Sequence, residues 1–306
     1  MHSRFSIRQW GMLVSVVLAV MVLILAVFLI TDRSRKSNQA MAKNSSSMDS
    51  SSAADISIVP LDSTEALEFG GGYNEAYQRL SELVLNLAAQ YQGSIGIALV
   101  PVNNPSRSIV LGDRLVAPAW STLHVPIAMA LMKGHSIDTD QLGSFIQETN
   151  TDVAAQYYSA LGAPPAASVK VNDILRQGGD TTTALSAGTT KPCSVTAWSL
   201  FDQANWAANI RKISGSELVL QAMSDNSGAS SFGLGHVDGA IYKTGWGVDF
   251  AGDFSVRQFG LAETPFGEYG VSLLVHPGDG SFGTAQIMAN DLVRALAQVA
   301  FDKTSE

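Results

Sequence analysis

The chain has 306 residues, of which 46% are apolar, and Cys193 is its single cysteine. This composition supplies a folded core and excludes both an intramolecular disulfide framework and a multi-cysteine zinc site. Six of the 19 basic residues lie in the first 43 positions, where Asp32 is the only one of the 27 acids. The remainder therefore carries 13 basic and 26 acidic residues. Such an acidic body repels phosphate, so we expect no nucleic-acid partner.

The chain begins with an apolar segment. Residues 11–30 carry no charge, and Ser15 is the only polar side chain among them. As a helix this segment would span about 30 Å, the thickness of a bilayer's hydrocarbon core. We predict a tail at residues 1–9 and a transmembrane anchor at 10–30, with the membrane as a partner through residues 11–30. A cleaved signal peptide is the alternative, but the small-residue site Ala40-Met41-Ala42 lies well beyond the apolar run, which favours a retained anchor.

The charges that flank the anchor do not determine on which side of the membrane the rest of the chain, called the body here, lies. Arg4 and Arg8 precede the anchor, whereas Arg33, Arg35 and Lys36 follow it, so the positive-inside rule does not favour an external body. Residues 31–72 are rich in serine and are predicted to form a hydrophilic linker.

The remaining residues, 73–306, are predicted to form one folded domain. Apolar residues at three- and four-residue steps predict a helix over 73–92, and two apolar runs predict a hairpin of strands at 94–100 and 108–111. The following helices are expected at 122–133, 138–148, 152–161, 171–177, 194–209 and 216–223. Three strands are then expected at 240–244, 253–259 and 270–275, before a helix at 284–301. The order predicts an α+β fold, with a five-stranded antiparallel sheet flanked by N- and C-terminal helices and a helical subdomain (about 117–239) inserted after the second strand.

Two short motifs contain candidate chemical groups. Ser121 lies at the start of an apolar helix, where free backbone N–H groups and the helix dipole favour negative charge. His124 follows three residues later on the same helix face. The second motif, Lys243-Thr244-Gly245, ends a predicted strand that precedes two more strands and the last helix.

The order and spacing of these blocks resemble the penicillin-recognising serine enzymes, and most closely the class A β-lactamases, over about residues 73–300. That family carries S-x-x-K, S-D-N and K-T-G around one pocket. Three further stretches are similar to the family, namely residues 152–156, 174–183 and 223–228. The resemblance implies a β-lactamase-like fold, acyl transfer through a serine nucleophile, and no cofactor.

The resemblance also implies a role for each residue of the site. Ser121 would be the nucleophile, and the backbone N–H groups of Ser121 and Trp246 would form the oxyanion hole. Lys243 and Thr244 would meet the carboxylate of a ligand, beside Gly245. At the place of the family's S-D-N stand Asn150, Thr151 and Asp152, which present different donors and acceptors. The implied ligands are a peptidoglycan peptide or a β-lactam.

The sequence departs from the family pattern at the general base. His124 stands where the family has a lysine, and an imidazole can accept a proton near neutral pH. It is shorter than lysine, however, and it removes a permanent cation beside Ser121. We favour lost chemistry at His124 over a working Ser121–His124 pair. A histidine that is hydrogen-bonded within a helix interface is the third interpretation.

Two further departures affect hydrolysis. The literal Ser224-Asp225-Asn226 lies too late in the chain for the family's S-D-N, and we interpret it as a turn at a helix end. Class A enzymes use an omega-loop glutamate to activate the deacylating water, but no acid occurs between Asp180 and Lys191. We interpret Asp180 as a loop or helix-capping residue.

These observations predict a membrane-tethered domain with degenerate catalytic motifs that serves as a binding or regulatory module of the cell envelope. The resemblance, and not the charge pattern, implies that this domain is extracytoplasmic. The alternative is an active or slow serine hydrolase that uses Ser121 with His124 as base. A purely structural envelope protein is a third possibility. The histidines of the body show no paired metal-ligand spacing, so no metal site is expected.

Overall fold

The computed structural model describes residues 71–300 except 149, 226–230 and 265–266. The predicted tail, the anchor and nearly all of the linker therefore lie outside the described residues. Within the described range, no helix combines the length and the apolar character that crossing a membrane requires.

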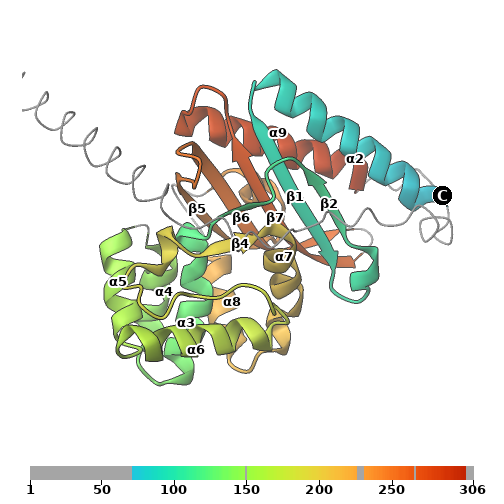
Figure 1. Cartoon of the computed structure of the whole chain (residues 1–306). Helices are drawn as coiled ribbons and strands as arrows, with labels where there is room; N and C mark the ends of the chain where they lie inside the picture. The colour runs from blue at the N-terminus through green and yellow to red at the C-terminus, as the bar shows by residue number, and fades with distance from the viewer. Residues whose placement is uncertain (1–70, 149, 226–230, 265–266, 301–306) are drawn as a thin grey trace, which may run out of the picture. The chain divides into compact units, whose positions relative to one another are not determined.

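A single antiparallel sheet of five strands is the centre of the folded domain (Figure 1). Its strands are β1 (Ser94–Pro101), β2 (Ile109–Gly112), β5 (Ile241–Val248), β6 (Phe254–Thr264) and β7 (Gly267–His276), in the spatial order β2-β1-β7-β6-β5. The strands form because apolar and β-branched runs alternate with glycine-containing turns. The predicted five-stranded sheet is confirmed, and β5 forms one of its edges.

The two terminal helices cover one face of this sheet. α2 (Gly71–Gln90) packs beside α9 (Phe282–Ala300). Leu80 of α2 and Met288 and Leu292 of α9 are almost fully buried in one cluster with Leu273 of β7. The apolar stripe of each helix thus faces the sheet, as the helical spacing predicted.

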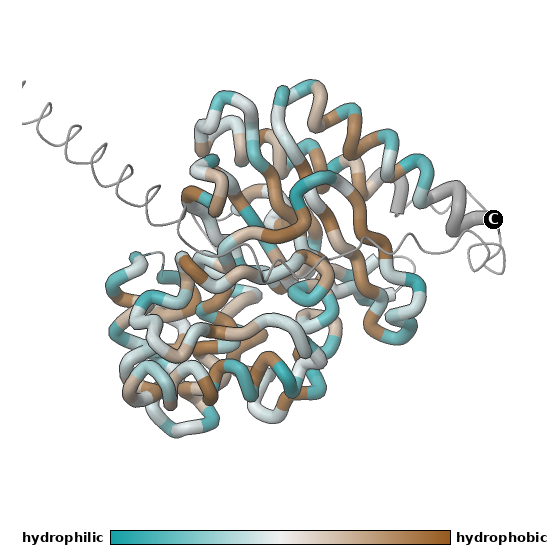
Figure 2. Tube along the Cα trace, in the orientation of Figure 1, coloured by the Kyte–Doolittle hydropathy of each residue, from teal (hydrophilic) through white to brown (hydrophobic). Residues whose placement is uncertain are grey.

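The opposite side of the sheet carries the inserted helical subdomain. Its helices are α3 (His124–Lys133), α4 (Thr139–Gln147), α5 (Thr151–Ser159), α6 (Pro164–Gln177), α7 (Leu200–Asn209) and α8 (Ser216–Ser224). Leu131, Phe145, Val171 and Val219 are among the buried side chains that these helices share. Figure 2 shows apolar segments alternating with polar ones along the tube of this region, as amphipathic helices require.

Among these helices, α7 packs directly on the sheet. It contacts β1, β6 and β7, and the approach is closest at Gly270 of β7. A Cβ atom at Gly270 would lie 2.1 Å from the carbonyl oxygen of Ala204 and 2.6 Å from the nitrogen of Ala208. Only glycine therefore allows the helix backbone to lie this near to the strand.

The helix predicted over 194–209 is wrong in its first part. Residues Ala197–Ser199 form β4, which pairs with β3 (Val116–Pro118) in a separate two-stranded sheet. The helix starts only at Leu200, because the Ser199 hydroxyl accepts a hydrogen bond from the backbone nitrogen of Asp202 at 3.0 Å and caps α7. Similarly, α6 starts at Pro164 rather than at 171, since prolines suit the first turn of a helix.

A buried arginine joins the small sheet to the large one. Arg257 of β6 is fully buried and donates hydrogen bonds to the carbonyl oxygens of Ala117, Pro118 and Trp198, at 3.1, 2.8 and 3.1 Å. Burial lowers the pKa of Arg257 to about 9. The guanidinium thereby fixes β3 and β4 against the sheet, just before the segment that contains Ser121.

Candidate functional site

The predicted nucleophile lies in a tight turn. The 3₁₀ helix η3 (Trp120–Leu123) leads directly into α3, and Ser121 is partly exposed. Trp120 adopts a φ of 45°, a left-handed conformation that costs an ordinary residue on the order of 1–3 kcal/mol. Its indole is buried in a cluster with Ala98, Leu200 and Leu274, and this packing holds the strained turn in place.

The structure brings the two candidate motifs together. A Cβ atom at Gly245 of β5 would lie 3.0 Å from the backbone nitrogen of Ser121 and 3.1 Å from that of Thr122. The edge strand of the sheet therefore passes directly beside the turn that contains Ser121. The predicted proximity of Ser121 to the Lys243-Thr244-Gly245 motif is thus present in the fold.

A buried polar network connects this turn to α7 and β7. The Thr122 hydroxyl donates to the carbonyl oxygen of Ala119 and accepts from Gln203 Nε2 at 2.9 Å. Gln203 Oε1 in turn accepts from the Ser272 hydroxyl at 2.7 Å. Thr122, Gln203 and Ser272 are all fully buried. The sequence analysis did not identify this network, although Gln203 is a polar residue on the buried face of α7.

His124 lies inside the helical subdomain. Its side chain is 1% exposed, its Nδ1 donates to the carbonyl oxygen of Phe145 at 3.3 Å, and its ring stacks on that of Phe145 with centroids 4.7 Å apart. Burial and, to a smaller extent, the charge of Lys243 lower the pKa of His124 to about 3, although the hydrogen bond with Phe145 acts in the opposite direction. The imidazole is therefore neutral at pH 7. No hydrogen bond joins the side chain of His124 to that of Ser121, which the structure also describes.

The side chains of Lys243 and Thr244 are both buried and hydrogen-bonded within the protein. Lys243 Nζ donates to the carbonyl oxygen of Glu148 at 3.3 Å. Burial lowers the pKa of Lys243 to about 8, although the nearby Cys193 and Glu148 raise it. The Thr244 hydroxyl accepts from Gln258 Nε2 at 2.9 Å. Neither side chain is exposed in this conformation, so a ligand would have to reach them through a change in their surroundings.

The side chain of Trp246 lies on the face of β5 opposite to the face of Gly245, because successive side chains of a strand point to alternate faces of the sheet. Its indole packs against Phe282 of α9, with ring centroids 5.2 Å apart. The indole therefore does not lie beside Ser121. Only the backbone N–H of Trp246 remains a candidate for the oxyanion hole.

The two candidates near α5 lie on the surface. Asn150 caps α5, and its Oδ1 accepts from the backbone nitrogens of Asp152 at 2.8 Å and Val153 at 3.4 Å. The Asp152 carboxylate accepts from Lys191 Nζ at 2.7 Å. Both side chains are exposed, so they are accessible but already engaged in local bonds.

The omega-loop segment provides no exposed acid. Asp180 is fully buried, and its Oδ1 accepts from the backbone nitrogens of Thr182 and Thr183 at 3.1 and 2.9 Å. Arg176 lies 3.7 Å from the same carboxylate. These contacts confirm the loop-capping interpretation of Asp180. The helix-end interpretation of Ser224 and Asp225 is also confirmed, since α8 ends at Ser224 and Asp225 caps it.

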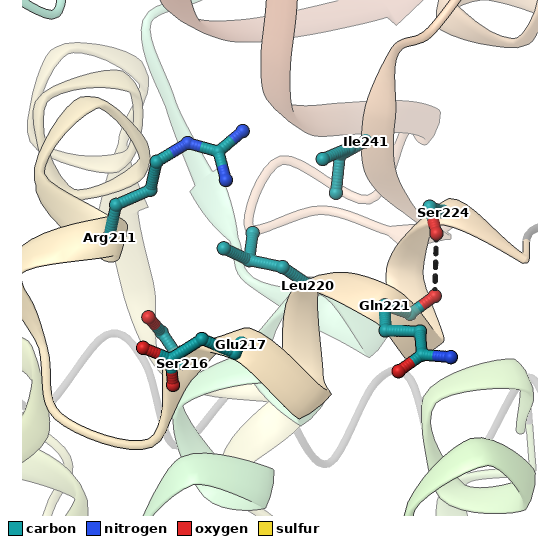
Figure 3. Close-up of a pocket in the computed structure, with 7 residues that line it drawn as sticks. All are labelled: Arg211, Ser216, Glu217, Leu220, Gln221, Ser224 and Ile241. Carbon is teal, nitrogen blue, oxygen red and sulfur yellow. Dashed lines mark hydrogen bonds between the residues drawn. The ribbon is translucent and has the colours of Figure 1, made fainter.

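A separate cavity lies beside α8, with a volume of about 420 Å³ (Figure 3). It is lined by Arg211, Ser216, Glu217, Leu220, Gln221, Ser224 and Ile241. None of the predicted site residues lines it. Among the residues that the structure describes, no group of three or more histidine, cysteine or acidic side chains is placed to hold a metal ion.

Comparison with known proteins supports the fold. No protein-family model matches the chain, and no curated protein matches it. PBP-A superposes with a TM-score of 0.55 at 15% identity, over 73% of this chain and 95% of that one. A β-lactamase from Sphaerobacter thermophilus gives 0.55 at 14% identity, over 73% and 97%, and a class A β-lactamase from Bacteroides cellulosilyticus gives 0.56 at 12%, over 73% and 98%. The chain thus has the α+β fold of the β-lactamase-like serine enzymes. These similar structures include a class A β-lactamase and PBP-A, which confirms the predicted resemblance at the level of the fold.

Proposed function

We propose that this chain is a membrane-tethered, extracytoplasmic β-lactamase-like domain that has lost efficient catalysis and serves as a binding or regulatory module of the cell envelope. One observation carries the loss of catalysis. The residue in the position of the family's catalytic lysine, His124, is buried, neutral and hydrogen-bonded to Phe145 instead of Ser121.

The other groups that turnover requires are likewise engaged elsewhere. Acyl transfer needs a base for the serine, and hydrolysis of the acyl-enzyme needs a base for water. Asp180, the acid nearest the omega-loop position, is fully buried and hydrogen-bonded to its own loop. Ser121 therefore has a defined position next to β5, but its hydroxyl has no hydrogen-bonded proton acceptor among the residues that the structure describes.

The proposed ligand is a peptidoglycan peptide or a β-lactam. A variant of PBP-A, which shares the fold, has been solved as an acyl-enzyme complex with penicillin G. In this chain Lys243 lies on the same face of β5 as Gly245, which touches the Ser121 turn. A pKa of about 8 leaves its amine mostly cationic at pH 7, so it provides a positive charge near the site.

We expect the full-length protein to show no turnover of a chromogenic cephalosporin, measured by absorbance at pH 7. The variant His124→Lys should also show none, because restoring an amine at this position leaves the deacylating base absent. Robust hydrolysis by the unaltered chain that disappears in Ser121→Ala would contradict the proposal. Hydrolysis by His124→Lys alone would show that the omega-loop argument is wrong.

Covalent labelling separates the proposal from the alternative. A fluorescent penicillin that labels the chain, and fails to label Ser121→Ala, would favour a slow acylating serine hydrolase. Since His124 does not bond to Ser121, we expect no such label between pH 6 and 9, a range that extends well above about 6.5, where an exposed imidazole becomes neutral and able to accept a proton.

The location of the body is part of the same proposal. The uncharged segment 11–30 supports an anchor, whereas its flanking charges do not determine the orientation. Alkaline phosphatase fused after Glu306 is active only outside the cytoplasm. We expect activity from this fusion, and an inactive fusion that is expressed at normal levels would place the body inside.

A further inference from the structure

The cavity beside α8 has the dimensions of a small-ligand site. It is bounded by α8, by the 3₁₀ helix η5 (Ile210–Lys212) and by the first residue of β5, Ile241. Glu217, Leu220, Gln221 and Ser224 are spaced by three or four residues and so share one face of α8. At about 420 Å³ the cavity lies within the range of about 300–1,000 Å³ that is usual for ligand pockets.

The residues that line the cavity combine apolar side chains with polar ones. Figure 3 shows Leu220 lying between the side chain of Arg211 and that of Ile241, with Ser216 and Glu217 together at one end of the site. Leu220 is almost fully buried. Ser216 is 1% exposed, and its hydroxyl has no hydrogen-bond partner among the described residues. This oxygen is itself shielded from solvent, so it takes no part in the site.

The charges around the cavity favour a cation. Its one basic group, Arg211, is already neutralised by Glu268, which accepts from Arg211 Nε at 3.2 Å and from Nη2 at 2.7 Å. Glu263 also acts on the same guanidinium. Glu217, in the first turn of α8, forms no ion pair with any residue that the structure describes. The cavity therefore presents one free carboxylate beside an apolar surface.

We infer that this cavity binds a primary alkylammonium group carried on a short apolar chain. The ammonium group donates to the Glu217 carboxylate, and the chain lies against Leu220 and Ile241. The site is separate from Ser121 and does not depend on the function proposed above.

The test uses n-hexylammonium as the probe and the full-length protein held in nanodiscs of a zwitterionic lipid. Binding is followed by the methyl resonances of Leu220 and Ile241. We expect saturable shifts with a dissociation constant on the order of 1 mM, as suits a ligand of so few atoms. Glu217→Gln removes the charge at nearly constant shape, and we expect it to weaken binding at least tenfold. Glu82→Gln, which removes an exposed glutamate from α2, should bind as the unaltered chain does.

Three results would overturn the inference. The first is an equal affinity of Glu217→Gln and the unaltered chain for n-hexylammonium, and the second is hexanoate binding as tightly as n-hexylammonium or more tightly. The third is the absence of any shift of the methyl resonances at an n-hexylammonium concentration 20-fold above about 1 mM. Hexanoate binding would assign the site to Arg211 instead. Leu220→Phe fills the cavity and should abolish binding. Because Glu217 is exposed, the Glu217→Gln comparison stands even where the Leu220 variant fails to fold.

Discussion

Replacing Gly270 with alanine is expected to lower the free energy of unfolding by about 3 kcal/mol, at the upper end of the usual cost of overpacking. The added methyl group would lie 2.1 Å from the carbonyl oxygen of Ala204 and 2.6 Å from the nitrogen of Ala208. Both atoms belong to the backbone of α7, so the helix itself has to move. It would then lose the packing of Leu200 and Ala204 on the sheet. Urea denaturation at pH 7 measures the change.

Gly143→Ala is the matched control for this variant. Gly143 lies within α4, and a Cβ atom there would meet no other atom within 4 Å. Alanine is the better helix former, so this variant should gain up to about 1 kcal/mol. If Gly270→Ala were as stable as the unaltered chain, the close packing of α7 on β7 would be contradicted.

Acidification from pH 7 to pH 5 should destabilise the folded chain by about 2 kcal/mol through His124 alone. Burial lowers the pKa of His124 to about 3 in the folded chain, whereas a histidine in the unfolded chain has a pKa near about 6.5. Between these two values the unfolded chain binds a proton that the folded chain does not. The stability contributed by His124 is therefore complete above the unfolded pKa and is lost progressively as the pH falls toward 3.

Urea midpoints at pH 7 and pH 5 test this expectation in three proteins. His124→Gln should lose the acid-sensitive part of the stability, whereas His236→Gln, which removes an exposed histidine, should keep it. An identical pH dependence in the unaltered chain and His124→Gln would exclude the buried imidazole as its source. Should His124→Gln fail to fold, NMR of the ring in the unaltered chain decides the point. The ring must remain neutral at pH 5.

Much of the fold was predictable because long apolar patterns are local signals. The helix at α9 and the strands β5, β6 and β7 each repeat their apolar residues at the spacing of their structure. The short strands β3 and β4 have only three residues each, too few for a period to show. Their position also depends on Arg257, more than 50 residues from β4 in the sequence, which no local pattern indicates.

The site was less predictable than the fold. Only the resemblance to a family predicted that Ser121 lies near Gly245. Local patterns could not predict this contact, because it joins segments more than 100 residues apart. The resemblance also implied that His124 stands at the position of the family's lysine. It did not show that His124 stacks on Phe145, or that Thr244 is bonded to Gln258, since both contacts arise from tertiary packing. The burial of Lys243 and Thr244 likewise depends on the packing of the whole fold, so the sequence did not indicate it.

Gln203 connects three parts of the protein through a single amide group. Its nitrogen donates to Thr122 in the turn, and its oxygen accepts from Ser272 in the sheet, while its backbone belongs to α7. Separating any of these elements would leave a donor or an acceptor stranded away from water. The position of the turn that contains Ser121 is consequently fixed by fully buried side chains behind it. Exposed residues around the turn can be replaced without breaking these buried hydrogen bonds, so the position of Ser121 does not depend on them.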